Sequence, residues 1–164
     1  MEIRFIADNN VGKLARLLRL MGYDSLLLRQ KDDSQMIKSA LSEQRVIVTK
    51  DGEFMKRRLV TKGKLRAIHI GEDDPESQLE RVVTALNLDY HFKPFSRCLE
   101  CNQILISRSK EEVKGLVPGR VFETQTEYTQ CPACQRIYWP GTHWQAMVKK
   151  LRDLKIGGGD GAPA

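Results

Sequence analysis

The chain has 164 residues, of which 41% are hydrophobic and 29% are charged, the composition of a soluble globular protein. No apolar run approaches the length of a membrane-spanning helix, and residues 1–8 are too acidic and too poor in apolar residues for a secretory signal. We therefore expect no membrane span and a cytoplasmic location. The formal net charge of +6 favours polyanionic partners such as nucleic acids.

Hydrophobic periodicity and turn residues predict alternating strands and helices in the first part of the chain. Strands are expected at residues 3–7, 25–28, 45–49 and 66–70. Helices are expected at residues 11–21, 33–42 and 53–59, and a further helix is expected to begin at Pro75, because proline suits a first helical turn. This alternation predicts an α/β fold with a parallel sheet and helices on both faces.

The composition changes after Leu88, where residues 89–94 show no periodicity and lead into Cys98. We therefore expect an α/β domain over residues 1–90 and a second, small domain over residues 91–154. In the second domain, Thr142 is expected to begin a helix that runs to about residue 154. Residues 155–164 are rich in glycine and are expected to form a disordered tail.

The chain's cysteines form two Cys-x-x-Cys pairs. Two residues between cysteines let one tight turn present both sulfurs to a zinc ion, which prefers four tetrahedral ligands. The sequence therefore predicts a small C-terminal zinc ribbon with one structural zinc ion bound by Cys98, Cys101, Cys131 and Cys134. The alternative, a redox-active pair, is expected near a helix start in a thioredoxin-like unit, and both pairs lie outside the βα region. His143 is left out of the ligand set, because a lone histidine is more often a packed or capping residue.

Acidic residues follow the predicted strands. Asp8 follows the first, Asp33 the second and Asp51 the third. Ligands in open α/β sheets bind beyond the carboxyl ends of the strands, so we expect these carboxylates at one edge of the sheet. Clustered carboxylates hold the Mg²⁺ or Mn²⁺ ions that assist phosphodiester hydrolysis. The sequence therefore predicts Asp8, Asp33 and Asp51 as catalytic residues that bind Mg²⁺ or Mn²⁺.

Helix capping is the alternative explanation for several acids, because aspartate is common where a helix follows a strand. For Asp33 both explanations are open, and Asp32 competes with it for the same role. Capping explains Asp73 and Asp74 somewhat better than metal binding does. Glu53 is either a fourth metal ligand or a favourable charge in a first helical turn.

Two groups of basic residues accompany the acids. The first group is expected along the polar side of the first helix and consists of Lys13, Arg16 and Arg19. The second group consists of Lys56, Arg57 and Arg58, followed by Lys62, Lys64 and Arg66. A solvated helix face explains either group alone, but two basic groups beside an acidic cleft suit a nuclease that attracts RNA. RNA is therefore the expected partner.

Several sequence blocks, taken together, resemble the PIN-like RNase domain with an appended zinc ribbon, of the Mut-seven C-terminal type. The blocks are residues 5–8 (Phe-Ile-Ala-Asp), 12–16 (Gly-Lys-Leu-Ala-Arg), 18–19, 22–24 (Gly-Tyr-Asp), 32–33, 46–51 (Val-Ile-Val-Thr-Lys-Asp), the two cysteine pairs and 138–144 (Tyr-Trp-Pro-Gly-Thr-His-Trp). The resemblance implies a PIN-like fold and a metal-dependent ribonuclease, with Asp8, Asp33 and Asp51 in the acidic cleft. Asp24 also matches a family position, but it precedes the second strand and is expected at the opposite edge of the sheet.

Two classes of function follow from these observations. The leading hypothesis is a metal-dependent endoribonuclease that hydrolyses RNA phosphodiester bonds. The alternative is a non-catalytic zinc-ribbon module that binds RNA or a ribosomal surface, with the acids acting as helix caps. An aspartyl-phosphate hydrolase is disfavoured, because Asn10 stands where such an enzyme uses a second aspartate after Asp8.

Overall fold

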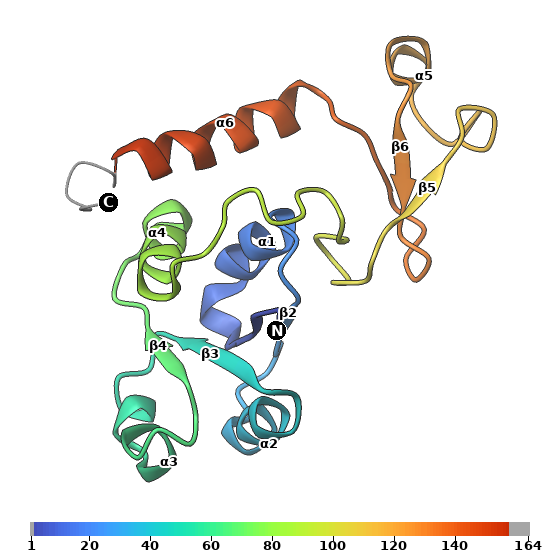
Figure 1. Cartoon of the computed structure of the whole chain (residues 1–164). Coiled ribbons are helices and arrows are strands. Elements are labelled where there is room, and N and C mark those ends of the chain that lie inside the picture. The colour runs from blue at the N-terminus through green and yellow to red at the C-terminus, as the bar shows by residue number, and fades with distance from the viewer. Residues whose placement is uncertain (1, 158–164) are drawn as a thin grey trace. The chain divides into compact units, whose positions relative to one another are not determined.

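A computed structural model describes residues 2–157 (Figure 1). The chain divides into two compact units, one that ends at Asn102 and one that begins at Gln103. The structure therefore groups residues 91–102, which we expected in the second domain, with the first unit. Among the described residues, no helix combines the length and the apolar character that crossing a lipid bilayer requires.

The first unit alternates strands and helices, as predicted. Its elements are β1 (Arg4–Ala7), η1 (Asn9–Val11), α1 (Gly12–Leu20), β2 (Ser25–Leu27), α2 (Asp33–Glu43), β3 (Arg45–Thr49), η2 (Phe54–Lys56), α3 (Arg58–Thr61), β4 (Ala67–His69) and α4 (Pro75–Leu86), where η marks a short 3-10 helix. The strands form one sheet in the order β2-β1-β3-β4, and every neighbouring pair is parallel. The predicted parallel sheet is confirmed, with strand ends that differ only slightly from the expected ones.

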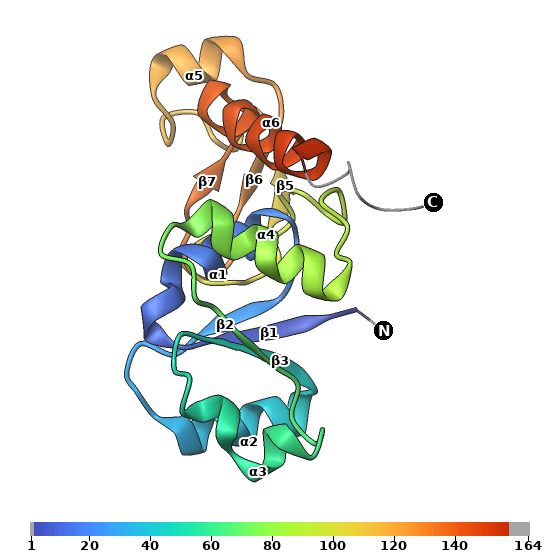
Figure 2. The same ribbon diagram turned by 90° about the vertical axis from the view of Figure 1, so that its left-hand side faces the viewer.

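Helices cover both faces of this sheet. Figure 2 shows α1 and α4 on one side and α2 and α3 on the other. Side chains of β1 alternate between the two faces: Phe5 contacts Tyr23 edge-on at a ring distance of 6.0 Å, whereas Ile6 packs in a cluster with Met36 and Phe54. All residues of β3 are buried, as expected for a central parallel strand covered on both faces.

The single helix predicted over residues 53–59 is wrong. The structure has the short η2, then Arg57 with an extended backbone (φ −61°, ψ 141°), and then the separate helix α3. An extended residue interrupts the helical hydrogen-bond ladder. Arg57 Nη2 lies 2.9 Å from Asp33 Oδ2, and the Arg57 guanidinium lies 5.4 Å from the centre of the Phe54 ring. These contacts stabilise the break, and the ion pair joins residues too distant in sequence for local periodicity to show it.

An ion pair of the buried Arg45 side chain lies at the amino edge of the sheet. The Arg45 side chain, 4% exposed, donates from Nη1 to Asp24 Oδ1 at 2.8 Å and from Nη2 to Glu43 Oε2 at 2.9 Å. Asn102 Nδ2 also donates to Asp24 Oδ1, at 2.7 Å. Burial opposes ionisation of Asp24, but the hydrogen bonds from Arg45 and Asn102 outweigh it and lower the pKa of Asp24 from its ordinary value.

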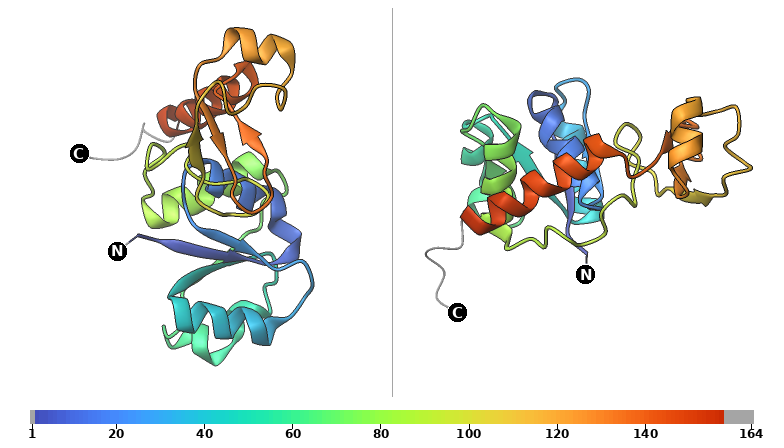
Figure 3. Two further views of the ribbon diagram at one scale, coloured as in Figure 1. Left: turned by 90° about the vertical axis from the view of Figure 1, so that its right-hand side faces the viewer. Right: turned by 90° about the horizontal axis from the view of Figure 1, so that it is seen from above.

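The second unit contains a small antiparallel sheet in the order β5-β6-β7. Its elements are β5 (Ile106–Arg108), α5 (Gly119–Thr124), β6 (Tyr128–Gln130), β7 (Ile137–Tyr138) and α6 (Thr142–Gly157). The helix expected from Thr142 is confirmed, and it extends to Gly157. Figure 3 shows α5, in orange, beyond one end of the strands. Of the predicted disordered tail, residues 158–164 lie outside the described residues.

Asp24→Asn should lower the free energy of unfolding at neutral pH by about 3 kcal/mol, because it leaves the buried Arg45 guanidinium with less compensating charge. The pKa of Asp24 is lower in the folded than in the unfolded chain, so its stabilisation is present above the unfolded pKa and is lost as pH falls through the folded pKa. Urea unfolding should therefore show a difference between wild type and Asp24→Asn that shrinks progressively at acid pH.

Asp73→Asn is the control for this experiment, because the Asp73 side chain is 96% exposed and its ion pair with Lys50 lies at the surface. Equal stability of wild type and Asp24→Asn at neutral pH would contradict the assignment of Asp24 to a stabilising ion pair.

Candidate functional site

The strand order β2-β1-β3-β4 has a topological switch point between β1 and β3. From β1 the chain first adds β2 on one side of β1, and it later adds β3 on the other side. Ligands bind beyond the carboxyl ends of strands at such points. Ala7 pairs with Val48 in the sheet, and the Asp8 amide donates to Val48 O at 3.2 Å. This register places Asp8, directly after β1, beside Thr49, the last residue of β3.

A solvent-open pocket with about 360 Å³ of empty volume lies at this edge. The three predicted catalytic acids all line it, together with other polar residues: Asp8, Asn9, Asn10, Gln30, Lys31, Asp32, Asp33, Thr49 and Asp51. The structure therefore brings Asp8, Asp33 and Asp51 to one pocket, although they are far apart in the sequence. Their catalytic role stays a prediction.

The Thr49 hydroxyl links two of these acids. Thr49 Oγ1 donates to Asp8 Oδ2 at 2.5 Å and accepts from the Asp51 amide at 3.0 Å. The other oxygen of Asp8 accepts from the Asn10 amide at 2.9 Å. Sequence reasoning missed Thr49; the signal available was a hydroxyl residue at the end of a buried strand, two positions before an acid. Thr49 fixes the Asp8 carboxylate and the start of the Asp51 loop at the same time.

Asp51 is oriented by its own loop. Its Oδ1 accepts from the Glu53 amide at 2.9 Å and from the Phe54 amide at 3.4 Å. Its Oδ2 lies 3.8 Å from Lys31 Nζ. Glu53 itself is 80% exposed, pairs with Lys56 and does not line the pocket. The Asp51 carboxylate is thus held at the pocket wall with a cation opposite its second oxygen.

The structure separates the two neighbouring acids at the start of α2. Asp32 is the N-cap, because its Oδ1 accepts from the Gln35 amide at 3.0 Å. Asp33 is the first residue of the helix, is 26% exposed, and forms an ion pair with Arg57. Capping therefore accounts for Asp32 rather than for Asp33. Capping also accounts for Asp74, whose Oδ2 accepts from the Ser77 amide at 2.9 Å at the start of α4.

Two cations balance part of the negative charge at the pocket. Lys31 faces Asp51 and Arg57 pairs with Asp33, which reduces the repulsion between carboxylates at one edge. Among residues 2–157, only the four cysteines form a group of potential ligands close enough to hold a metal ion as they stand. The three acids share a pocket without forming such a group.

The residues predicted to bind RNA differ in exposure. Lys13, Lys56 and Arg58 are exposed, and Arg16 is exposed beside its ion-pair partner Glu100. The placement of Arg19 on the polar side of the first helix is wrong. Arg19 is 5% exposed.

The Arg19 side chain forms hydrogen bonds to the backbone instead. Its Nε donates to Ser25 O at 2.9 Å, and its Nη1 donates to Leu99 O at 2.8 Å. Helical periodicity assigned every charged side chain of α1 to the solvent side, because it does not show that the loop containing Leu99 packs against this helix. Arg19 is therefore not part of the surface that RNA would contact.

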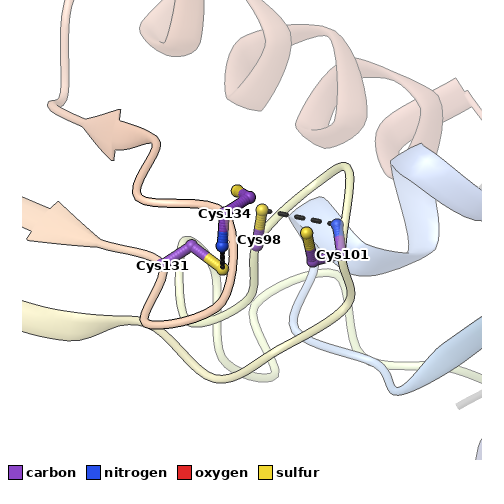
Figure 4. A group of neighbouring side chains, drawn as sticks. All are labelled: Cys98, Cys101, Cys131 and Cys134. Atoms are coloured by element: carbon purple, nitrogen blue, oxygen red, sulfur yellow. Dashed lines mark hydrogen bonds between the residues drawn. The ribbon is translucent and has the colours of Figure 1, made fainter.

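The four cysteines cluster, with their sulfur atoms all within 4.8 Å of one another (Figure 4). The two Cys-x-x-Cys turns repeat one geometry: Cys98 Sγ accepts from the Cys101 amide at 3.4 Å, and Cys131 Sγ accepts from the Cys134 amide at 3.5 Å. Four sulfurs about 2.3 Å from a tetrahedral zinc ion lie about 3.8 Å apart. The cluster is therefore compact enough for the four-sulfur zinc site that the sequence predicted.

Comparison with protein families agrees with this architecture. The model of the Mut7-C RNAse domain matches residues 3–151, which include the α/β unit and both cysteine pairs. Comparisons with curated proteins and with solved structures gave no match. The resemblance that the sequence blocks indicated is confirmed, and the chain belongs to the Mut7-C RNAse domain family.

Proposed function

We propose that the protein is a metal-dependent endoribonuclease that hydrolyses RNA phosphodiester bonds at the pocket beyond β1 and β3. The observation that carries the proposal is the convergence of Asp8, Asp33 and Asp51 on that pocket from three separate segments. Membership of an RNase domain family supports RNA as the substrate.

The donor atoms of the pocket suit a hard divalent cation. Mg²⁺ and Mn²⁺ prefer carboxylate, amide and water oxygens, and the pocket offers the carboxylates of Asp8, Asp33 and Asp51 beside the side chains of Asn9 and Asn10. When bound, such an ion supplies an activated water and neutralises negative charge on the leaving oxygen. Asp8 and Asp51 are the principal ligands in this proposal, because Thr49 fixes them relative to each other.

The remaining pocket residues bind and orient the substrate. Lys31 is 72% exposed and close to Asp51, so its ammonium group can contact a phosphate at the pocket. Arg57 is 47% exposed in its pair with Asp33. A phosphate that draws the Arg57 guanidinium away frees the Asp33 carboxylate for the cation, so RNA binding and completion of the acidic site are coupled. The exposed residues Lys13, Arg16, Lys56 and Arg58 extend the positive surface.

The cysteine cluster has a structural role in this proposal. Cys98, Cys101, Cys131 and Cys134 bind one Zn²⁺, and four sulfur ligands leave no position for a reacting water. The strands β5, β6 and β7, with the two cysteine turns, then form the zinc ribbon that the sequence predicted. Zinc stabilises this part of the chain, because ligation and folding are coupled in so small a unit.

Asp8→Asn should reduce Mg²⁺- or Mn²⁺-dependent RNA cleavage by at least about 100-fold, the scale of losing one charge-stabilising group. The fold and most RNA binding should persist, because asparagine keeps the shape of aspartate and can still accept from Thr49. Asp51→Asn should behave alike, and Asp73→Asn, outside the pocket, is the control. Cleavage is measured on purified protein with EDTA and metal add-back. Equal cleavage by wild type and Asp8→Asn would favour the non-catalytic RNA-binding alternative.

Thr49→Val should lower kcat about tenfold or more with little change in KM, because loss of the hydroxyl releases the Asp8 carboxylate without removing a contact to RNA. Thr49→Ser restores the hydroxyl and should recover most of the rate. Steady-state kinetics with thermal unfolding as a folding check measure both effects. If Thr49→Ser is as impaired as Thr49→Val, the hydroxyl does not position Asp8.

Elemental analysis of protein purified without chelator should find one zinc ion per chain. Cys131→Ser should lose the zinc and lower hydrogen-exchange protection in β5, β6 and β7, while the four-stranded sheet remains protected. His143→Ala is the matched control and should retain zinc, because His143 lies outside the cysteine cluster. Absence of zinc from the wild-type protein would refute the assignment.

A further inference from the structure

A second and larger pocket, with about 880 Å³ of empty volume, lies at the opposite, amino edge of the parallel sheet. The starts of β1 and β3, the end of α2 and the turn before β4 line it. We propose that this amino-edge pocket binds phosphate groups of a single RNA strand whose scissile bond lies at the acidic pocket. The inference rests on the proposed function and adds the path that the substrate takes.

Unbalanced positive charge is the first observation. Arg4, Lys64 and Arg66 line the amino-edge pocket, and none of them forms an ion pair with any carboxylate that the structure describes. The lining acid, Glu2, is already paired with Lys93 at 2.8 Å. Arg45 also lines the pocket, but its charge is balanced by Asp24 and Glu43. Three cations therefore line this pocket without an ion-pair partner among the residues that the structure describes.

An exposed apolar side chain accompanies these cations. Leu41 lines the same pocket and is 47% exposed. A nucleotide combines a phosphate with an apolar base face, and single-strand binders pair cationic grooves with surfaces on which bases rest. The lining of the amino-edge pocket matches both parts of a nucleotide.

The route between the two pockets is the third observation. The segment of residues 56–66 leads from the carboxyl edge of the sheet back to its amino edge, as the connection between the parallel strands β3 and β4 must. It carries a series of exposed cations: Lys56, Arg57, Arg58, Lys62, Lys64 and Arg66. We call this segment the basic crossover. A strand of five residues is about 17 Å long, the length of about five nucleotides at the 3.4 Å spacing of a stacked strand.

RNA length therefore decides which contacts form. A short RNA occupies the acidic pocket alone, whereas a longer strand follows the basic crossover and places successive phosphates at Arg4, Lys64 and Arg66. Each phosphate contact in a single strand contributes about 0.7 to the slope of log affinity against log salt. Loss of the amino-edge contacts should weaken the binding of long RNA and reduce its salt dependence.

The test compares single-stranded oligouridylates of about 4 and about 12 nucleotides, bound in EDTA and followed by fluorescence anisotropy at several salt concentrations. The triple variant Arg4→Gln, Lys64→Gln, Arg66→Gln should weaken binding of the longer RNA at least about tenfold and lower its salt slope by about 2, with the shorter RNA changed less than about twofold. The matched control removes equal charge elsewhere, at the exposed residues Lys38, Lys114 and Lys149.

Unchanged affinity of the triple variant for the longer RNA would overturn the inference, as would an equal loss in the control or an equal loss for the shorter RNA. If Arg4→Gln lowers the melting temperature, the double variant Lys64→Gln, Arg66→Gln replaces the triple variant, because both of its residues are exposed in the turn before β4. Because binding is measured in EDTA, the result is independent of cleavage. Length-dependent loss in a protein without metal-dependent cleavage would support the RNA path and refute only the proposed chemistry.

Discussion

The parallel pairing of β1 with β3 places Asp8 and Thr49 side by side, and the candidate site depends on this register. Because side chains alternate along a strand, a shift of one residue would exchange the faces of every β3 side chain. Burial of the whole of β3 opposes such a shift, since its side chains fill the core on both faces of the sheet. The Thr49 hydroxyl then joins the Asp8 carboxylate to the Asp51 amide. The hydrophobic core thus determines the positions of groups that take no part in core packing.

Polar contacts perform a similar role at the first cysteine turn. Arg19 is buried and donates to the backbone oxygen of Leu99, which lies between Cys98 and Cys101. The Asn102 side chain donates to Asp24, and the Asn102 backbone amide donates to Cys98 O at 2.9 Å. Groups that support metal ligands from outside fix the orientation of those ligands. The turn that carries Cys98 and Cys101 is therefore held by helix α1 and by the amino edge of the sheet.

Much of the fold follows from local pattern, and the carboxyl-edge position of the acids follows from parallel topology. What the sequence could not show depends on contacts between distant residues. The break at Arg57 accompanies its ion pair with Asp33, and the burial of Arg19 depends on the loop at Leu99. In the sequence, Thr49 is only the last residue of a predicted strand. Its hydrogen bond to Asp8 depends on the register between β1 and β3. The amino-edge pocket likewise combines Arg4 with a turn that lies far along the chain, a pairing set by the sheet.

The proposed cation site lies beyond β1 and β3 and is formed by carboxylates that follow separate strands. It can be tested with a crystal structure of the protein grown with Mn²⁺, in which anomalous difference density is measured near the manganese edge. We expect a peak bound by carboxylate oxygens of Asp8 and Asp51, at the distance of about 2.1 Å typical of a hard octahedral cation. Ordered manganese elsewhere in the crystal with no peak at Asp8 and Asp51 would refute the proposed site.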